Sequence, residues 1–292
     1  MIDTKPDLVI NKIISQLDSL TPKGKKLGNY IIQNPRKAVF MTTKELSEAC
    51  GVSEATVVRF VGQLGYKGYG ELIQAMRDFV DSGMTLPDRM NLPGMKAPGL
   101  ELLHRVVLEE INNLQQFYES IDEKVLHDIV NEFLQSQTIY VIGSRISYAF
   151  AYYLGWSLTK IRKDIHILKG SDSATIDWLT NASKESLVVI IAISRYPNEL
   201  IKLGKVTRRL QHRLLVITDN ALCPVIPFAH LSLLIPSRSI PLIGHPTTIS
   251  CIINYIILEL INRQDATMNR HQEKLEQMYL ENDILFNMHV DM

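Results

Sequence analysis

The sequence predicts two domains of different class, an all-α domain followed by a five-stranded parallel α/β domain. The chain of 292 residues is longer than one small domain usually is. Residues 1–81 carry helical patterns without strand-like alternation, whereas short apolar runs alternate with helical stretches from Thr138 onward. Residues 82–99 hold Pro and Gly too often for a regular element. We therefore expect a linker there, a second domain at 100–265 and a helical tail at 266–292.

Composition sets limits on the class of protein. The chain is 46% hydrophobic and has 31 basic and 31 acidic residues, which is ordinary for a soluble globular protein. Its first residues lack the pattern of a signal peptide, and no apolar run approaches membrane-spanning length. We expect a cytoplasmic protein without a membrane partner. Cys50, Cys223 and Cys251 have apolar neighbours and no metal-ligand spacing, so we expect three buried thiols, no bound metal and no cofactor.

Two capped helices stand close together in the first domain. Thr42 and Glu45 have the spacing of a capping box, in which each side chain bonds to the other residue's backbone amide. Gly51 can adopt the left-handed conformation of a tight turn between helices. Ser53 is a good N-cap for a second helix, predicted from residue 54 to residue 64. This arrangement predicts a helix-turn-helix.

The second helix of this pair has an apolar face and a polar face. Val57, Val61 and Leu64 share the face predicted to pack inward, and we expect Thr56, Arg59 and Gln63 on the outward face. A basic side chain on an exposed second helix is typical of DNA recognition in the major groove. The candidate DNA-binding residues are Lys44, Ser53, Thr56, Arg59, Gln63 and Lys67. A helical protein-interaction module is the alternative reading of the same pattern.

The second domain begins with two amphipathic helices, expected at 100–118 and 122–135, which either cover the sheet or pair with a second chain. Nearly continuous apolar strands separated by helices indicate a parallel sheet covered on both faces. The five strands are predicted at Thr138 to Ile142, Ile165 to Leu168, Leu187 to Ile193, Leu214 to Thr218 and Leu231 to Ile235.

Ligands of parallel α/β sheets bind at the carboxyl ends of strands, beside helix N-termini that attract anions. The loops after the first and third strands hold hydroxyls and guanidinium groups, which suit an anion. The candidate ligand-binding residues are Ser144, Arg145, Ser147, Ser194, Arg195 and Glu199. Ser171, Ser173 and His245 are weaker candidates, because each has a more ordinary explanation, such as a helix cap for Ser171 and a turn for His245.

Residues 41–72 closely resemble the DNA-binding domain of the RpiR family of bacterial regulators. The similarity is most specific in Val-Ser-Glu-Ala-Thr-Val-Val-Arg-Phe at 52–60 and Leu-Gly-Tyr-Lys-Gly-Tyr at 64–69. The resemblance implies a C-terminal sugar isomerase (SIS) domain that binds a sugar phosphate. It also implies a homodimer or dimer of dimers that binds an operator in double-stranded DNA and represses genes of carbohydrate metabolism.

The predicted ligand loops depart from the SIS pattern. Arg145 replaces the second Gly of the first loop, and Arg195 and Pro197 replace a Gly and a Thr of the other. Two other functions therefore stay open, a regulator whose SIS domain only dimerises and an isomerase with an accessory helical domain. Isomerisation needs a positioned acid and base, for which Glu199 and His245 are the candidates. We expect no enzyme and no catalytic residue, because an isomerase has no evident need for a DNA-binding domain.

Overall fold

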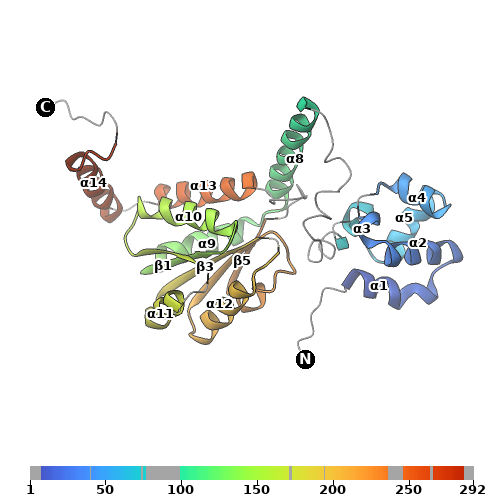
Figure 1. The fold of residues 1–292 in the computed structure, drawn as a ribbon, viewed down its shortest axis with the longest axis horizontal. Helices are drawn as coiled ribbons and strands as arrows, with labels where there is room; N and C mark the ends of the chain where they lie inside the picture. The colour runs from blue at the N-terminus through green and yellow to red at the C-terminus, as the bar shows by residue number, and fades with distance from the viewer. Residues whose placement is uncertain are drawn as a thin grey trace. The chain divides into compact units, whose positions relative to one another are not determined.

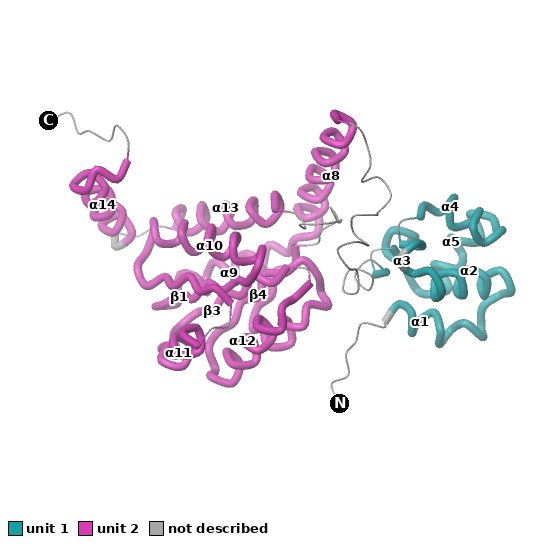
Figure 2. Tube along the Cα trace, in the orientation of Figure 1, with its two compact units in different colours: residues 1–98 teal, residues 99–292 magenta. Residues whose placement is uncertain are grey.

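The computed structural model describes residues 8–39, 41–73, 75–76, 99–170, 173–193, 195–235, 246–263 and 266–285. The chain divides into two compact units, Met1–Pro98 and Gly99–Met292, which Figure 2 draws in different colours. The predicted linker at 82–99 lies outside the described residues except for Gly99, which begins a helix. Among the helices described, none combines the length and apolar character needed to cross a membrane.

All regular elements among the described residues of unit 1 are helices (Figure 1). Its elements are α1 (Leu8–Gln16), the short 3-10 helix η1 (Leu17–Ser19), α2 (Pro22–Gln33), α3 (Pro35–Ala38), α4 (Thr43–Cys50) and α5 (Glu54–Gln63). The α2 helix begins where Thr21 accepts the amide of Gly24 at 3.2 Å and Pro22 occupies the first helical position. The core of the unit buries Leu46 of α4 with Val57 of α5. This confirms the predicted inward face of the second helix.

Unit 2 is an α/β domain with five parallel strands in the order β2-β1-β3-β4-β5. The strands are β1 (Thr138–Gly143), β2 (Ile165–Lys169), β3 (Ser186–Ala192), β4 (Arg213–Thr218) and β5 (Leu231–Leu234). The helices are α8 (Gly99–Ser120), α9 (Glu123–Gln135), α10 (Ser147–Thr159), α11 (Ser173–Asn181), α12 (Asn198–Arg209), η2 (Ile226–Phe228), α13 (Pro246–Asn262) and α14 (Ala266–Glu281). All five strands lie within one residue of their predicted bounds, which confirms the predicted fold class.

The sheet is covered on both faces. The helices α9, α10 and α13 lie on one face and α11 and α12 on the other (Figure 1). Along β1, Ile139 and Val141 belong to the first apolar cluster, whereas Tyr140 and Ile142 belong to the second. The central strand β3 is buried along its whole length. Burial on both faces is the reason that these strands are continuous apolar runs rather than alternating ones.

The three cysteines have different surroundings. Cys223 is buried, as predicted, but Cys50 is half-buried and Cys251 is exposed. Burial of all three was therefore the wrong expectation. The α13 helix that carries Cys251 is apolar on most of its surface, so apolar neighbours do not tell which side packs inward. Only the face that includes Ile249, Ile252 and Ile256 joins the core.

Candidate functional site

The helix pair of unit 1 is fixed by the local hydrogen bonds that its sequence predicts. The amide of Thr42 donates to Glu45 Oε2 at 2.7 Å and the amide of Glu45 donates to Thr42 Oγ1 at 3.2 Å, which completes the capping box. The amide of Thr42, and to a smaller extent its hydroxyl, donate to the Glu45 carboxyl and lower its pKa. Gly51 ends α4 in the left-handed conformation with φ of 61°, and Ser53 accepts the amide of Thr56 to begin α5. The turn between the helices is therefore set by the chain itself.

Five of the six candidate DNA-binding side chains are exposed. These are Lys44, Ser53, Arg59, Gln63 and Lys67. Thr56 is the exception, because it is only 8% exposed and its hydroxyl lies 2.9 Å from that of Ser53. The prediction that Thr56 lies on the outward face was wrong, since the residue sits beside Val57 at the edge of the buried face. Its hydroxyl reinforces the start of α5 instead of facing solvent.

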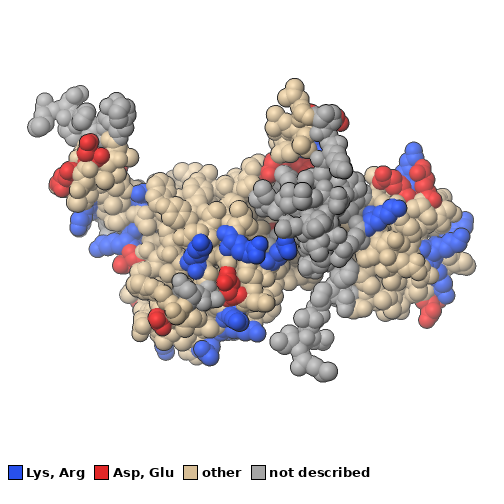
Figure 3. All heavy atoms as spheres, in the orientation of Figure 1, with Lys and Arg blue, Asp and Glu red and all other residues tan. Residues whose placement is uncertain are grey.

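The outward face of α5 is formed by Ala55, Val58, Arg59, Gly62 and Gln63, all of which are exposed. Sequence reasoning identified only Arg59 and Gln63 among them. The other three, Ala55, Val58 and Gly62, stand at the i, i+3 and i+7 positions of one helix face, with Arg59 at i+4, and this spacing was a usable signal. The Nε of Arg59 donates to the carbonyl oxygen of Ala55 at 3.2 Å, so the guanidinium lies along this face. Figure 3 shows Lys and Arg side chains interspersed with acidic ones around unit 1.

In unit 2 the strand order has its topological switch point between β1 and β3. From β1 the chain crosses to β2 on one side, and β3 then pairs with the other side of β1. At such a topological switch point the loops that follow the two neighbouring strands run to opposite faces of the sheet. Ligands of open α/β sheets bind between these loops, at the carboxyl ends of the strands. The β1–α10 and β3–α12 loops meet at this edge of the sheet. These loops hold the candidate ligand-binding residues.

Hydrogen bonds join the loops across the switch point. The Ser144 hydroxyl donates to Glu199 Oε1, and the Ser147 hydroxyl accepts the amide of Ile193 at 3.1 Å. Both serines are buried. At Gly143 a Cβ atom would lie 2.5 Å from the backbone oxygen of Ser147, so only glycine allows α10 to begin this close to the strand. The structure thus brings Ser144, Ser147 and Glu199 together.

Two arginines occupy unusual backbone conformations at the same edge. Arg145 has φ of 54° and Arg195 has φ of 60°, in the left-handed region that non-glycine residues seldom adopt. Each conformation costs on the order of 1 kcal/mol, and strain of this kind concentrates at binding sites. Both side chains are exposed. On the face drawn in Figure 3, several Lys and Arg side chains lie near one another over unit 2.

The remaining candidates have varied outcomes. Ser194, Ser171 and His245 lie outside the described residues. Ser173 is the exposed first residue of α11. Sequence reasoning missed a half-buried pair in the neighbouring loops, where the Tyr196 hydroxyl donates to Asp219 Oδ1 at 2.9 Å. Burial raises the pKa of Tyr196 and the Asp219 carboxylate adds to this effect, so the phenol stays protonated.

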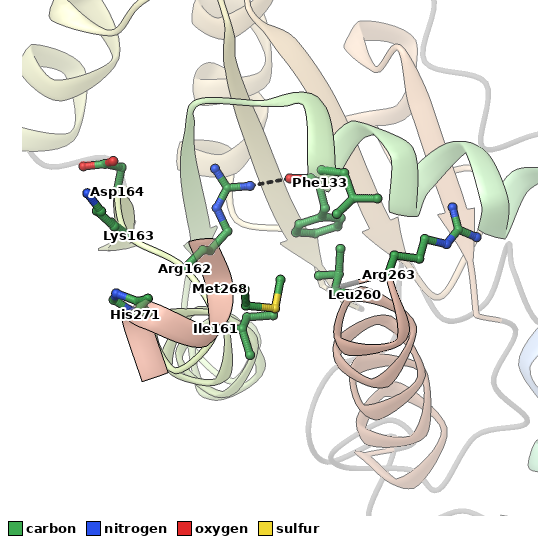
Figure 4. A pocket seen from close by; sticks show the side chains of 10 residues that line it. Phe133, Ile161, Arg162, Lys163, Asp164, Leu260, Arg263, Met268 and His271 are labelled. Atoms are coloured by element: carbon green, nitrogen blue, oxygen red, sulfur yellow. Dashed lines mark hydrogen bonds between the residues drawn. The ribbon is translucent and has the colours of Figure 1, made fainter. Parts of the chain in front are cut away.

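A cavity of about 330 Å³ lies near the amino ends of β1 and β2, away from the loops described above (Figure 4). It is lined by Phe133 and Leu134 from the end of α9, by the 161–164 segment that precedes β2, and by residues of α13 and α14. Arg162 donates hydrogen bonds to the carbonyl oxygens of Phe133, Ser136 and Gln137. This guanidinium therefore caps the end of α9. Within the described part of the chain, no group of three His, Cys, Asp or Glu side chains could hold a metal ion.

Comparisons with known proteins match both units. Residues 8–80 match the family described as helix-turn-helix domain, rpiR family, and residues 132–261 match the SIS domain. The HTH-type transcriptional regulator YbbH of Bacillus subtilis (strain 168) is 23% identical over 255 residues, which cover 85% of this chain and 87% of that protein.

Two solved structures share the fold. The Vibrio vulnificus NanR protein complexed with ManNAc-6P has a TM-score of 0.58 and 19% identity, with 96% of this chain and 100% of that chain covered. The sugar isomerase domain of an RpiR transcription factor from Sphaerobacter thermophilus has a TM-score of 0.56 and 19% identity, with 63% of this chain and 99% of that chain covered.

Proposed function

Because the chain belongs to the RpiR family of transcriptional regulators, with a helix-turn-helix domain and a SIS domain, we propose that it binds operator DNA through α5 under the control of an anionic effector. The observation that supports DNA binding is the outward face of α5, which presents Arg59 on a helix whose start and preceding turn are fixed by Ser53 and Gly51. A helix held in this way is suited to the major groove, where Arg pairs with guanine. Lys44 and Lys67 are exposed and supply phosphate contacts.

Binding to the DNA upstream of the chain's own gene tests this part. The affinity of the full-length protein for a fluorescent duplex of that region is measured by anisotropy, with unrelated DNA as competitor. We expect Arg59→Ala to weaken selective binding by about 5- to 150-fold, the range for a lost base contact. Arg209 at the end of α12 is also exposed and is the matched control, so Arg209→Ala should bind like the wild type. Equal affinity for all duplexes, or no loss in Arg59→Ala, would refute the proposal.

We propose that the effector is a sugar phosphate bound at the switch point between β1 and β3. Its support is the meeting of Ser144, Ser147 and Glu199 at this edge, with the exposed guanidinium groups of Arg145 and Arg195 on the flanking loops. Guanidinium groups bind phosphate in bidentate fashion. The Vibrio vulnificus protein of the same fold was solved with ManNAc-6P, which makes sugar phosphates the first class to test.

A thermal-shift screen of sugar phosphates and sugar acids tests the effector. A ligand at 100 times its dissociation constant stabilises the protein by about 2.7 kcal/mol. We expect Arg145→Ala and Arg195→Ala to remove this stabilisation, and Arg209→Ala, which changes an exposed arginine at the end of α12, to retain it. If no ligand of either class stabilises a protein that still binds DNA, the SIS domain serves only for dimerisation. Exchange of sugar protons with solvent that disappears in Glu199→Gln would instead support the isomerase alternative.

We further propose that the regulator is a repressor that acts as a homodimer or a dimer of dimers. The support for an oligomer is α8, whose exposed face carries Leu100, Leu103, Val107, Leu108 and Ile111 at 45–81% exposure. Apolar side chains gathered on one helix in this way are typical of an interaction surface. Light scattering of the full chain gives its mass directly, and a monomer at micromolar concentration would contradict the proposal. A reporter gene behind the operator distinguishes a repressor from an activator.

A further inference from the structure

The outward face of α5 contains an apolar side chain beside its arginine. Val58 is 58% exposed, although the neighbouring positions Val57 and Val61 are buried in the core. A β-branched residue has no helix propensity that would favour it at an exposed position. In the folded chain its isopropyl group gains little from burial, so the stability of unit 1 does not account for it.

Small residues flank Val58 on the same face. Ala55 precedes it by one turn and Gly62 follows it by one turn, and both are exposed. A Cβ atom added at Gly62 would meet no atom within 4 Å, and the residue is not among those with positive φ. Neither crowding nor backbone conformation therefore requires glycine at this position. The small residues leave a shallow surface around Val58, so that Val58 and Arg59 can approach a flat partner closely.

The chemistry of the major groove gives these two side chains different partners. The guanidinium of Arg59 can donate two hydrogen bonds to guanine, whereas an isopropyl group can neither donate nor accept one. The apolar group that the major groove offers is the 5-methyl group of thymine, and apolar side chains read thymine through it. Val58 and Arg59 are consecutive, so a helix that places one near a base edge brings the other near the same or the next base pair.

We propose that Val58 determines sequence specificity by contacting the 5-methyl group of thymine, next to the base read by Arg59. This inference rests on the proposed DNA-binding function and adds a residue and a base to it. Ala55 and Gly62 permit the contact because their small side chains let α5 lie close to the base edges. Cytosine has no methyl group at the same position. The contact would therefore distinguish a T·A pair from a C·G pair, independently of any hydrogen bond to the bases.

Deoxyuridine tests the proposal, because it differs from thymidine only by this methyl group. A duplex is first selected from a random library with the full-length protein, and each thymine of the selected sequence is then replaced by deoxyuridine in turn. We expect at least one replacement to weaken binding by the wild type about fourfold, the effect of burying one methyl-sized group. Val58→Ala should bind the thymine and deoxyuridine duplexes equally well.

Ile14 of α1 provides a matched control, since it is 51% exposed in the same unit and lies outside α5. Ile14→Ala removes a comparable amount of exposed apolar surface and should keep the thymine preference of the wild type. A preference that persists in Val58→Ala, or its absence at every thymine in the wild type, would overturn the inference alone. Failure of the wild type to select any sequence would overturn the proposed function as well. The deoxyuridine scan of the wild type is informative even if Val58→Ala does not fold.

Discussion

Three glycines of this chain differ in what a side chain would meet, and they predict a graded series of stabilities. At Gly143 an added Cβ would lie 2.5–2.8 Å from backbone atoms of Ser147 and Tyr148. At Gly155 of α10 it would lie 2.5 Å from Cγ1 of Ile167 on β2, a side-chain atom. At Gly62 it would meet nothing within 4 Å. The backbone cannot rotate away from a clash, whereas a side chain can.

The expected changes in the free energy of unfolding follow from this difference. Overpacking costs about 1–3 kcal/mol, and we expect the upper end of about 3 kcal/mol for Gly143→Ala. Gly155→Ala should cost about 1 kcal/mol, because the helical preference of alanine over glycine offsets part of its overpacking. Gly62→Ala should stabilise unit 1 by about 0.5–1 kcal/mol, since it gains this preference without a clash.

Differential scanning calorimetry of the full-length protein measures these effects. For a domain of about 200 residues, 3 kcal/mol lowers Tm by about 6–12 °C, so the unit 2 transition of Gly143→Ala should move by that amount. Gly155→Ala should shift the same transition by about 2–4 °C. A smaller shift in Gly143→Ala than in Gly155→Ala would refute the reasoning, because it would mean that the start of α10 moves more readily than the Ile167 side chain.

Three further predictions concern single side chains. Ser53→Ala removes the N-cap of α5 and should lower the free energy of unfolding of unit 1 by about 1 kcal/mol. Thermal denaturation measures this change, and an unchanged Tm would mean that the cap is not needed. The Thr42 amide lowers the pKa of Glu45, so this carboxylate stabilises the fold above its ordinary pKa, and the contribution is lost as pH falls through the lowered value. During acid titration followed by circular dichroism, Glu45→Gln should lose less helical signal than the wild type. An equal loss of signal in both proteins would contradict this. Arg162→Met leaves three carbonyl oxygens at the end of α9 without their donor. The free energy of unfolding, measured by urea denaturation, should fall by about 2–3 kcal/mol. A change below about 0.5 kcal/mol would show that water replaces the guanidinium.

The sequence predicted best what depends on short stretches of chain. Thr42, Gly51 and Ser53 were placed correctly as a cap, a turn and a cap, because each bonds to residues a few positions away or adopts its own backbone conformation. The strands were found because burial on both faces leaves continuous apolar runs. Thr56 was misplaced because a residue at the boundary of two helix faces is assigned by packing, and packing depends on where the neighbouring helix lies.

The parts of the candidate site that escaped prediction depend on distant residues. The bond between Tyr196 and Asp219 joins the ends of two strands, and nothing in either loop alone indicates its partner. The bond from Ser144 to Glu199 crosses the switch point, so it depends on the strand order and on the left-handed Arg145 and Arg195 that shape the loops. The side chains had been chosen as candidates, but their pairing required the structure.

The bond between Ser144 and Glu199 also sets a condition on ligand entry. A serine hydroxyl has one proton to donate, and here that proton is already given to a carboxylate. An anion that takes the hydroxyl must displace the carboxylate, and two negative charges repel each other at such short range. Binding of the proposed anionic effector to the Ser144 hydroxyl would therefore require movement of the first turn of α12, which carries Glu199. The loop would then have two arrangements, one with the bond between Ser144 and Glu199 and one without it. An effector can shift their populations only by the difference in its affinity for them.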